Sequence, residues 1–176
     1  MKTFKEYLLE VPSDYIIYFD MDGVLADFVE RIEAVTGESV DAITKDQVAF
    51  KKLKAELVAN DFFTTLKPMD GVKLLKELVR DKYNVQILTS VSKFESSKVA
   101  VQKKAWLKKH VGFVPPFNYT TSSVDKAKYA KSNTILIDDR TKSTVPFKAA
   151  GGITILHKSY QSTKKQLLTI LESNRG

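Results

Sequence analysis

The amino-acid sequence predicts an α/β fold, a Rossmann-like doubly wound parallel sheet with a small helical insertion after its first strand. Short runs rich in Ile, Val, Tyr and Thr alternate along the chain with segments of helical periodicity, an order typical of α/β proteins. These runs are apolar almost throughout rather than at every second residue, which indicates strands covered on both faces. The first connection spans about sixty residues, roughly twice the length of an ordinary crossover between parallel strands.

Five segments are predicted as strands, because each is short, rich in β-branched or aromatic residues and bounded by turn residues. They are residues 15–20, 84–90, 117–121, 133–139 and 152–156. Five segments with apolar residues at helical spacing are predicted as helices. They are residues 28–37, 45–61, 71–83, 96–110 and 162–173. The apolar residues of the fourth helix, set among lysines, are Val99, Val101, Ala105 and Trp106.

The long first connection predicts the domain organisation. Its surplus, residues 27–66, has helical character and follows the carboxyl end of the first strand, where open α/β sheets bind ligands. We therefore expect residues 1–26 and 67–176 to form the α/β core, and residues 27–66 to form a small helical cap over the site.

The charge of the chain is strongly positive, +7 from 28 Lys and Arg against 21 Asp and Glu. A basic surface attracts anions, including phosphate esters and nucleic acid. One group of lysines lies on and just before the fourth predicted helix, and we expect a solvated helix face there, with a binding surface as the alternative. The group comprises Lys93, Lys98, Lys103, Lys104, Lys108 and Lys109. We do not expect nucleic acid as a partner, because the interleaved aromatic residues of a single-strand binder are missing.

Three absences indicate a cytoplasmic protein without a membrane partner. The chain has no cysteine, which excludes disulfides and thiolate chemistry and fits a reducing compartment. No apolar run approaches the roughly 18 residues of a membrane-spanning helix. The opening "MKTFKEYLLEV" lacks the apolar core and cleavage site of a signal peptide.

Two pairs of acids follow two of the predicted strands. Asp20 and Asp22 end the first strand with Gly23 directly after them, and Asp138 and Asp139 end the fourth. The carboxyl ends of the strands converge in a doubly wound sheet. Acids gathered there could share a Mg²⁺ ion, which prefers a few carboxylate oxygens with water and phosphate. Either pair alone could instead be a turn or an N-cap.

Four ordered motifs resemble those of the haloacid dehalogenase (HAD) superfamily of phosphohydrolases. They are "DMDGVLADF", "ILTS", "SVDK" and "ILIDDR". Val24 stands where most phosphatases of the superfamily carry threonine, and the first motif then resembles the 5'(3')-deoxyribonucleotidase branch. The segments "NDFFTTLKPMDGVKLLKEL", "KKAWLKKH" and "FKAAGGITILH" extend the resemblance over most of residues 14–172.

The resemblance implies a role for each acid. Asp20 would be the nucleophile that forms an aspartyl-phosphate, which water then cleaves. Asp22 would be the general acid and later the base, so its backbone carbonyl rather than its carboxylate would bind the metal. Asp139 would be the direct Mg²⁺ ligand and Asp138 its support, since alternation along a strand sends these two side chains to opposite sides.

Hydroxyls and a lysine would complete the phosphate site. The resemblance implies that Thr89, helped by Ser90, donates hydrogen bonds to the phosphoryl oxygens, although a threonine at a strand end often satisfies only a loop amide. A lysine would balance the clustered negative charge. Lys126 matches the motif best, with Lys128 as the alternative and Lys131 close behind.

Aromatic residues could shape the substrate pocket. The resemblance implies that Phe28 stacks on a nucleobase, and Phe62 and Phe63 would approach the same mouth. The alternative for all three is packing in the core of the cap. His110 and His157 stand apart from every other group of ligand-type residues, so we expect them to be surface or core histidines.

The predicted function is that of a Mg²⁺-dependent phosphomonoesterase whose partner is a nucleoside monophosphate, in deoxyribonucleotide metabolism. The alternatives are a phosphatase of the same superfamily acting on another small ester such as a sugar phosphate, a polynucleotide 3'-phosphatase, and a non-catalytic binding protein on the same fold.

Overall fold

The computed structural model describes residues 14–91 and 93–173, and its centre is a parallel sheet of five strands in the order β3-β2-β1-β4-β5. All neighbouring strands pair in parallel. The strands are β1 (Ile16–Phe19), β2 (Asn84–Ser90), β3 (Phe117–Thr120), β4 (Thr134–Asp138) and β5 (Ile153–Leu156). The predicted α/β class and its doubly wound sheet are confirmed. The opening segment, where we expect no signal peptide, lies outside the described residues.

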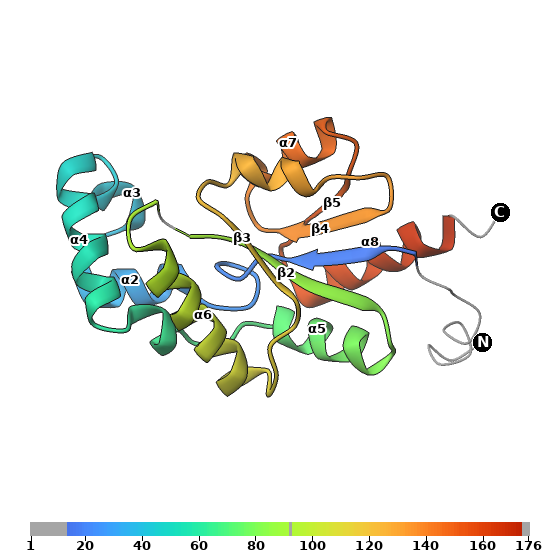
Figure 1. The fold of residues 1–176 in the computed structure, drawn as a ribbon, viewed down its shortest axis with the longest axis horizontal. Coiled ribbons are helices and arrows are strands. Elements are labelled where there is room, and N and C mark those ends of the chain that lie inside the picture. The colour runs from blue at the N-terminus through green and yellow to red at the C-terminus, as the bar shows by residue number, and fades with distance from the viewer. Residues whose placement is uncertain (1–13, 92, 174–176) are drawn as a thin grey trace.

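Helices cover both faces of the sheet, as Figure 1 shows with α7 on one side and α5 and α8 on the other. They are α5 (Gly71–Arg80), α6 (Ser96–His110), α7 (Thr141–Ala149), α8 (Tyr160–Ser173) and the 3₁₀ helix η2 (Val124–Tyr129). Alternation along β1 sends Ile17 and Phe19 into the larger core with α5, α6 and α8, while Tyr18 packs beside Phe147 of α7. This two-sided burial explains the nearly continuous apolarity of the strands.

Helix α7 is not among the predicted helices, and Pro146 lies inside it. A proline within a helix removes a backbone hydrogen bond, which weakens the helical signal in the sequence. Burial of Ser143, Thr144 and Phe147 against η2 and the sheet supplies the stability that local propensity lacks.

The segment between β1 and β2 forms four short helices before α5, and in Figure 1 these lie beyond the carboxyl ends of the strands. They are α2 (Phe28–Thr36), α3 (Val40–Ile43), α4 (Gln47–Ala59) and the 3₁₀ helix η1 (Phe62–Thr65). The side chain of Asp27 caps the start of α2, and Gly37 ends that helix with a φ of 72°.

The two connections of this segment to the sheet are hydrogen-bonded to each other. The backbone N–H of Asp27 donates to the carbonyl of Lys67 at 2.9 Å, and the N–H of Met69 donates to the carbonyl of Leu25 at 2.8 Å. These bonds hold the helices of residues 28–65 at the edge of the sheet where the strands end.

Helix α6 buries a face that differs from the apolar residues picked out in its sequence. Val99 and Trp106 are buried, but Val101 is 66% exposed, and Gln102 and Lys103 are buried instead. The expectation of a solvated lysine face is therefore wrong for Lys103. Within residues 14–91 and 93–173, no helix combines the length and the apolarity that crossing a membrane requires.

Candidate active site

The chain turns sharply after β1, which brings the first acid pair to the edge of the sheet. The N–H of Asp20 donates to the carbonyl of Ile137 at 2.9 Å, so this residue still pairs with the neighbouring strand. Gly23 has a φ of +82°, and a Cβ there would lie 2.1 Å from Oδ2 of Asp139. Glycine is therefore needed both for the turn and for the close approach of the two acidic segments.

Three aspartates meet at the ends of β1 and β4. Asp20, Asp138 and Asp139 each offer a carboxylate oxygen, and these oxygens all lie within 4.8 Å of one another. The expectation that the side chains of Asp138 and Asp139 point to opposite sides is wrong, because carboxylate oxygens of both lie in this cluster. Strand β4 ends at Asp138, so strand alternation no longer dictates the direction of the next side chain.

The hydrogen bonds of the two neighbouring acids distinguish them. Asp138 accepts from the backbone N–H of Arg140 at 2.9 Å through Oδ1, and from Lys126 at 2.6 Å through Oδ2. In contrast, Oδ1 of Asp139 is buried and accepts no hydrogen bond from any described residue. Asp139 therefore has an oxygen available for a cation, whereas both oxygens of Asp138 are already engaged.

Of the three candidate lysines after β3, the structure brings Lys126 to the acids. Its side chain is 1% exposed, and Nζ lies 2.9 Å from Oδ1 of Asp20. Lys128 is exposed and pairs with Asp125 at 2.8 Å, and Lys131 is also exposed.

The hydroxyl residues at the end of β2 lie beside a second buried lysine. Nζ of Lys103, on α6, donates to Oγ1 of Thr89 and to Oδ2 of Asp22, both at 2.8 Å, and to the carbonyl of Ser90 at 3.2 Å. Oγ of Ser90 lies 3.4 Å from Oγ1 of Thr120. The predicted Asp22, Thr89 and Ser90 thus converge on one ammonium group.

Lys103 is a residue that the sequence analysis missed as part of the site. A signal was present, because Lys103 follows Val99 by four residues and precedes Trp106 by three, which places all three on one face of α6. A lysine in register with buried residues has to find anionic or carbonyl partners.

Burial and mutual repulsion change the proton affinities of these acids. Burial, with help from Asp20 and Asp138, raises the pKa of Asp139 to about 7. Burial also raises the pKa of Asp22, although Lys103 opposes the effect. Burial alone would lower the pKa of Lys126, but the negative charges of Asp20 and Asp138 outweigh burial, so the pKa of Lys126 is raised. Acids held this close repel one another, and a divalent ion bound between them would relieve that repulsion further than Lys126 does alone.

The orphaned oxygens test whether a metal would fit. Oδ1 atoms of Asp20, Asp22 and Asp139 are buried without a hydrogen-bond partner among the described residues, although the one of Asp20 has its ion pair with Lys126. A cluster of carboxylate oxygens with spare lone pairs and no nitrogen or sulfur ligand suits a hard divalent cation. This acidic cluster could therefore bind a metal ion.

Aromatic side chains lie beside Lys103 at the polar site. Phe28 is stacked on Phe63 with ring centroids 6.2 Å apart, and Phe62 meets both rings edge-on. Phe62 is buried in the core, whereas Phe28 and Phe63 are partly exposed. Nζ of Lys103 lies 5.3 Å from the ring centroid of Phe63, so an apolar surface adjoins the polar site.

The side chains of the two histidines have partners outside the acidic cluster, although the backbone N–H of His157 donates to the carbonyl of Asp138 at 2.9 Å. Nδ1 of His157 lies 2.8 Å from Oγ1 of Thr163, and Nε2 lies 3.3 Å from Asp70. The ring of His110 packs against Trp106 at 4.7 Å. These contacts are those of packed and hydrogen-bonded histidines.

A parallel α/β sheet with acids, hydroxyls and buried lysines gathered at its strand ends defines a phosphohydrolase of the HAD-like class. A family model matches residues 14–167, and the chain belongs to that family, described as 5' nucleotidase, deoxy (pyrimidine), cytosolic type C protein. It is therefore an enzyme of the 5'-nucleotidase class, and the resemblance stated from its motifs is confirmed.

Among solved structures, the chain is similar to a hydrolase from Streptococcus pneumoniae TIGR4. The two share 16% sequence identity, the match covers 88% of this chain and 98% of that chain, and the TM-score is 0.47. No curated protein matches the sequence.

Proposed function

We propose that this protein is a Mg²⁺-dependent 5'(3')-deoxyribonucleotidase that hydrolyses nucleoside monophosphates through an aspartyl-phosphate on Asp20. The observation that supports this most is the 2.9 Å contact between Asp20 and Lys126 beside Asp139, with Asp22 two residues further along the chain. A family of 5'-nucleotidases supports the substrate class, and the partly exposed rings of Phe28 and Phe63 support an aromatic base near the phosphate.

The reaction takes place in two steps. A carboxylate oxygen of Asp20 attacks phosphorus and the bond to the nucleoside oxygen breaks, while Asp22 gives its proton to that leaving oxygen. Asp22, now a carboxylate, takes a proton from water as the water attacks the phosphorus of the aspartyl-phosphate. The products are a nucleoside and inorganic phosphate, and Asp20 is restored. The raised pKa of Asp22 favours the protonated form that a general acid needs.

The carboxylates of Asp20 and Asp139 and the backbone carbonyl of Asp22 are the proposed ligands of Mg²⁺. The bound ion would neutralise charge on the phosphoryl oxygens and on the acids. Asp138 supports the site indirectly, because its bonds to Arg140 and Lys126 fix the position of Lys126.

Thr89, Ser90 and the two buried lysines are the proposed donors to the phosphoryl oxygens. Lys126 lies beside Asp20, and Lys103 bonds to both Asp22 and Thr89. Each of the two proposed catalytic acids therefore has an ammonium group next to it. Such preorganised donors act strongly in a site that excludes water.

Replacing Lys103 with methionine is expected to lower kcat/KM by about 10²-fold, because Asp22 and Thr89 lose the ammonium group that holds them together. Lys104→Met is the matched control, since Lys104 is the next residue on α6 and is exposed. Steady-state kinetics of both variants measure the difference. Equal kcat/KM values in the two variants would contradict the proposed role of Lys103 in the site.

We propose that residues 27–66 act as the cap over this site, with residues 1–26 and 67–176 as the core. The cap carries Phe28 and Phe63, so it would decide which ester the enzyme accepts. A short helical cap suits a small substrate better than a polymer. The cytoplasmic location stays a prediction.

A substrate panel with purified protein tests the proposed function. We expect phosphate release from dUMP and dTMP in the presence of Mg²⁺ and none after EDTA treatment. Preference for hexose or triose phosphates would favour a sugar phosphatase instead. Oligonucleotide binding with a steep salt dependence would favour a polynucleotide phosphatase. Absence of turnover with every ester would leave the non-catalytic alternative.

A further inference from the structure

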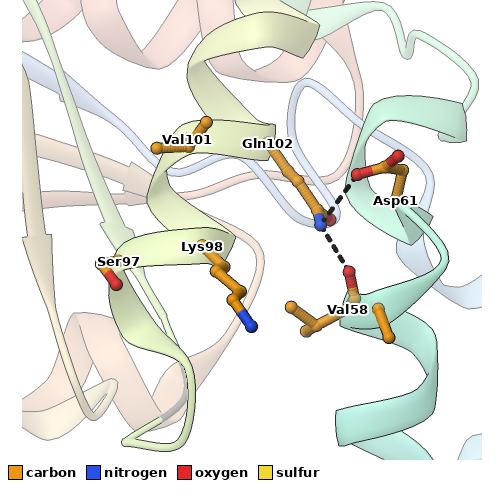
Figure 2. Close-up of a pocket in the computed structure, with 7 residues that line it drawn as sticks. Val58, Asp61, Ser97, Lys98, Val101 and Gln102 are labelled. Carbon is orange, nitrogen blue, oxygen red and sulfur yellow. Dashed lines mark hydrogen bonds between the residues drawn. The ribbon is translucent and has the colours of Figure 1, made fainter.

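Gln102 connects helix α6 to the segment that ends α4 and begins η1. Its side chain is 6% exposed, and Figure 2 shows it reaching from α6 toward Val58 and Asp61. Nε2 donates to the carbonyl of Val58 at 2.6 Å and to Oδ1 of Asp61 at 3.3 Å, and Oε1 accepts from the N–H of Phe63 at 3.3 Å. One buried amide thus satisfies polar groups on both sides of a tight turn.

The turn that Gln102 holds has an uncommon backbone conformation. Asp61 has a φ of +53°, in the left-handed region that favours glycine. Aspartate is one of the few residues other than glycine that adopt this region, and contacts with the surrounding structure hold it there. All three partners of Gln102 lie in residues 58–63, the segment that brackets this residue.

Trp106, one turn after Gln102 on α6, also bonds to the chain that follows α4. Its Nε1 donates to the carbonyl of Leu66 at 2.8 Å, and the side chain is fully buried. Gln102 and Trp106 are four residues apart, so both project from one side of α6. Helix α6 therefore holds the chain from Val58 to Leu66 by side-chain bonds to its backbone.

The residue after Gln102 is Lys103, which belongs to the polar site. One helix thus presents two neighbouring buried side chains, one bonded to Asp22 and Thr89 and the other bonded to the backbone of Phe63. Gln102 therefore bonds to the backbone of the residue whose ring centroid lies 5.3 Å from Nζ of Lys103.

We propose that Gln102 is a positioning residue that sets the separation between the phosphate-binding side chains and the aromatic wall at Phe63, and so determines how large a group the enzyme accepts on the ester. The inference rests on the proposed function, because it assumes that the phosphate of the substrate lies beside Lys103. Gln102 touches neither phosphate nor the reacting atoms, so its removal should change the binding of the organic group more than the chemical step.

The test is Gln102→Leu, which keeps the approximate size of the side chain but removes every hydrogen bond. We expect its KM for dUMP to rise about tenfold while kcat changes by less than about twofold, since a misplaced wall weakens binding of the base and leaves the chemistry intact. For glycerol phosphate, which has no base to contact the wall, both constants should stay within about twofold of wild type.

Gln166→Leu is the matched control, because Gln166 is exposed on α8 and the substitution is the same. It should leave both substrates unchanged. If Gln102→Leu does not fold, Gln102→Glu serves in its place. Glutamate keeps an acceptor for the N–H of Phe63 but cannot donate to Val58 and repels Asp61, so the KM for dUMP should again rise selectively. Equal losses for both esters, or no loss for either, would show that Gln102 has only a structural role or none.

Amide hydrogen exchange provides a readout that does not depend on turnover. In Gln102→Leu, residues 57–66 should exchange faster than in wild type while residues 124–140 keep their protection. Unchanged exchange over residues 57–66 would overturn the inference. If wild-type protein cleaves sugar phosphates but no nucleotide, the proposed function is wrong, and the KM comparison is then made between a hexose and a triose phosphate.

Discussion

Asp20→Asn is expected to abolish phosphate release from nucleoside monophosphates, with a loss of at least about 10⁴-fold in kcat. The amide of asparagine is a poor nucleophile and carries no charge to hold a cation. Because Lys126 retains its bond to Asp138, the variant should keep its fold, which circular dichroism would verify. Steady-state phosphate release, measured with saturating Mg²⁺, gives the loss.

The control for this variant is Asp41→Asn, the same substitution at an exposed position on α3. Its activity should stay within about twofold of wild type, as is usual for a surface substitution. If Asp20→Asn retained one tenth of the wild-type rate in a protein free of deamidated material, Asp20 would not be the nucleophile and the two-step mechanism would be wrong.

Lys126→Met is expected to lower kcat by about 10³-fold. Lys126 is buried, with Nζ 2.9 Å from Asp20 and 2.6 Å from Asp138. A water molecule in its place would carry no charge, so the two acids would repel one another. Without that charge, both the acids and the incoming phosphate lose their nearest counter-charge. The measurement is the same phosphate-release assay, combined with a melting curve to show that the variant is folded.

Lys128→Met tests which of Lys126 and Lys128 is the lysine of the site, a choice that the sequence left open. Lys128 is exposed and pairs with Asp125, and an exposed pair of this kind contributes little. Its removal should change kcat by less than about twofold. A large loss in Lys128→Met together with activity in Lys126→Met would contradict the proposed role of Lys126 and favour a register shift in the third motif.

The acids of the site could be predicted because they depend on strand ends alone. A parallel sheet brings the carboxyl ends of its strands to one edge, so Asp20 and Asp139 were expected near each other, and the structure shows that β1 and β4 are neighbours. The pattern of short apolar runs was enough to locate all five strands within one residue of their observed bounds. Glycine at position 23 marked the turn for the same local reason, since its φ is positive.

The burial of two side chains on α6 and the existence of helix α7 could not be predicted from the sequence. Lys103 was expected on a solvated, lysine-rich face and Gln102 was not singled out, but both are buried. Helix α7 was missed because its stability comes from packing on η2 and the sheet. In each case the deciding contacts join residues far apart in the chain.

The sequence by itself determined the class of fold, the positions of its five strands and the acids at the strand ends, because these follow from local periodicity and from the geometry of parallel sheets. Only the tertiary structure decided which lysines enter the site and which amide holds the aromatic wall. A long polar side chain takes its direction from the partners it can reach, and for Lys103 and Gln102 those partners are supplied by β2, by the turn after β1 and by the end of α4.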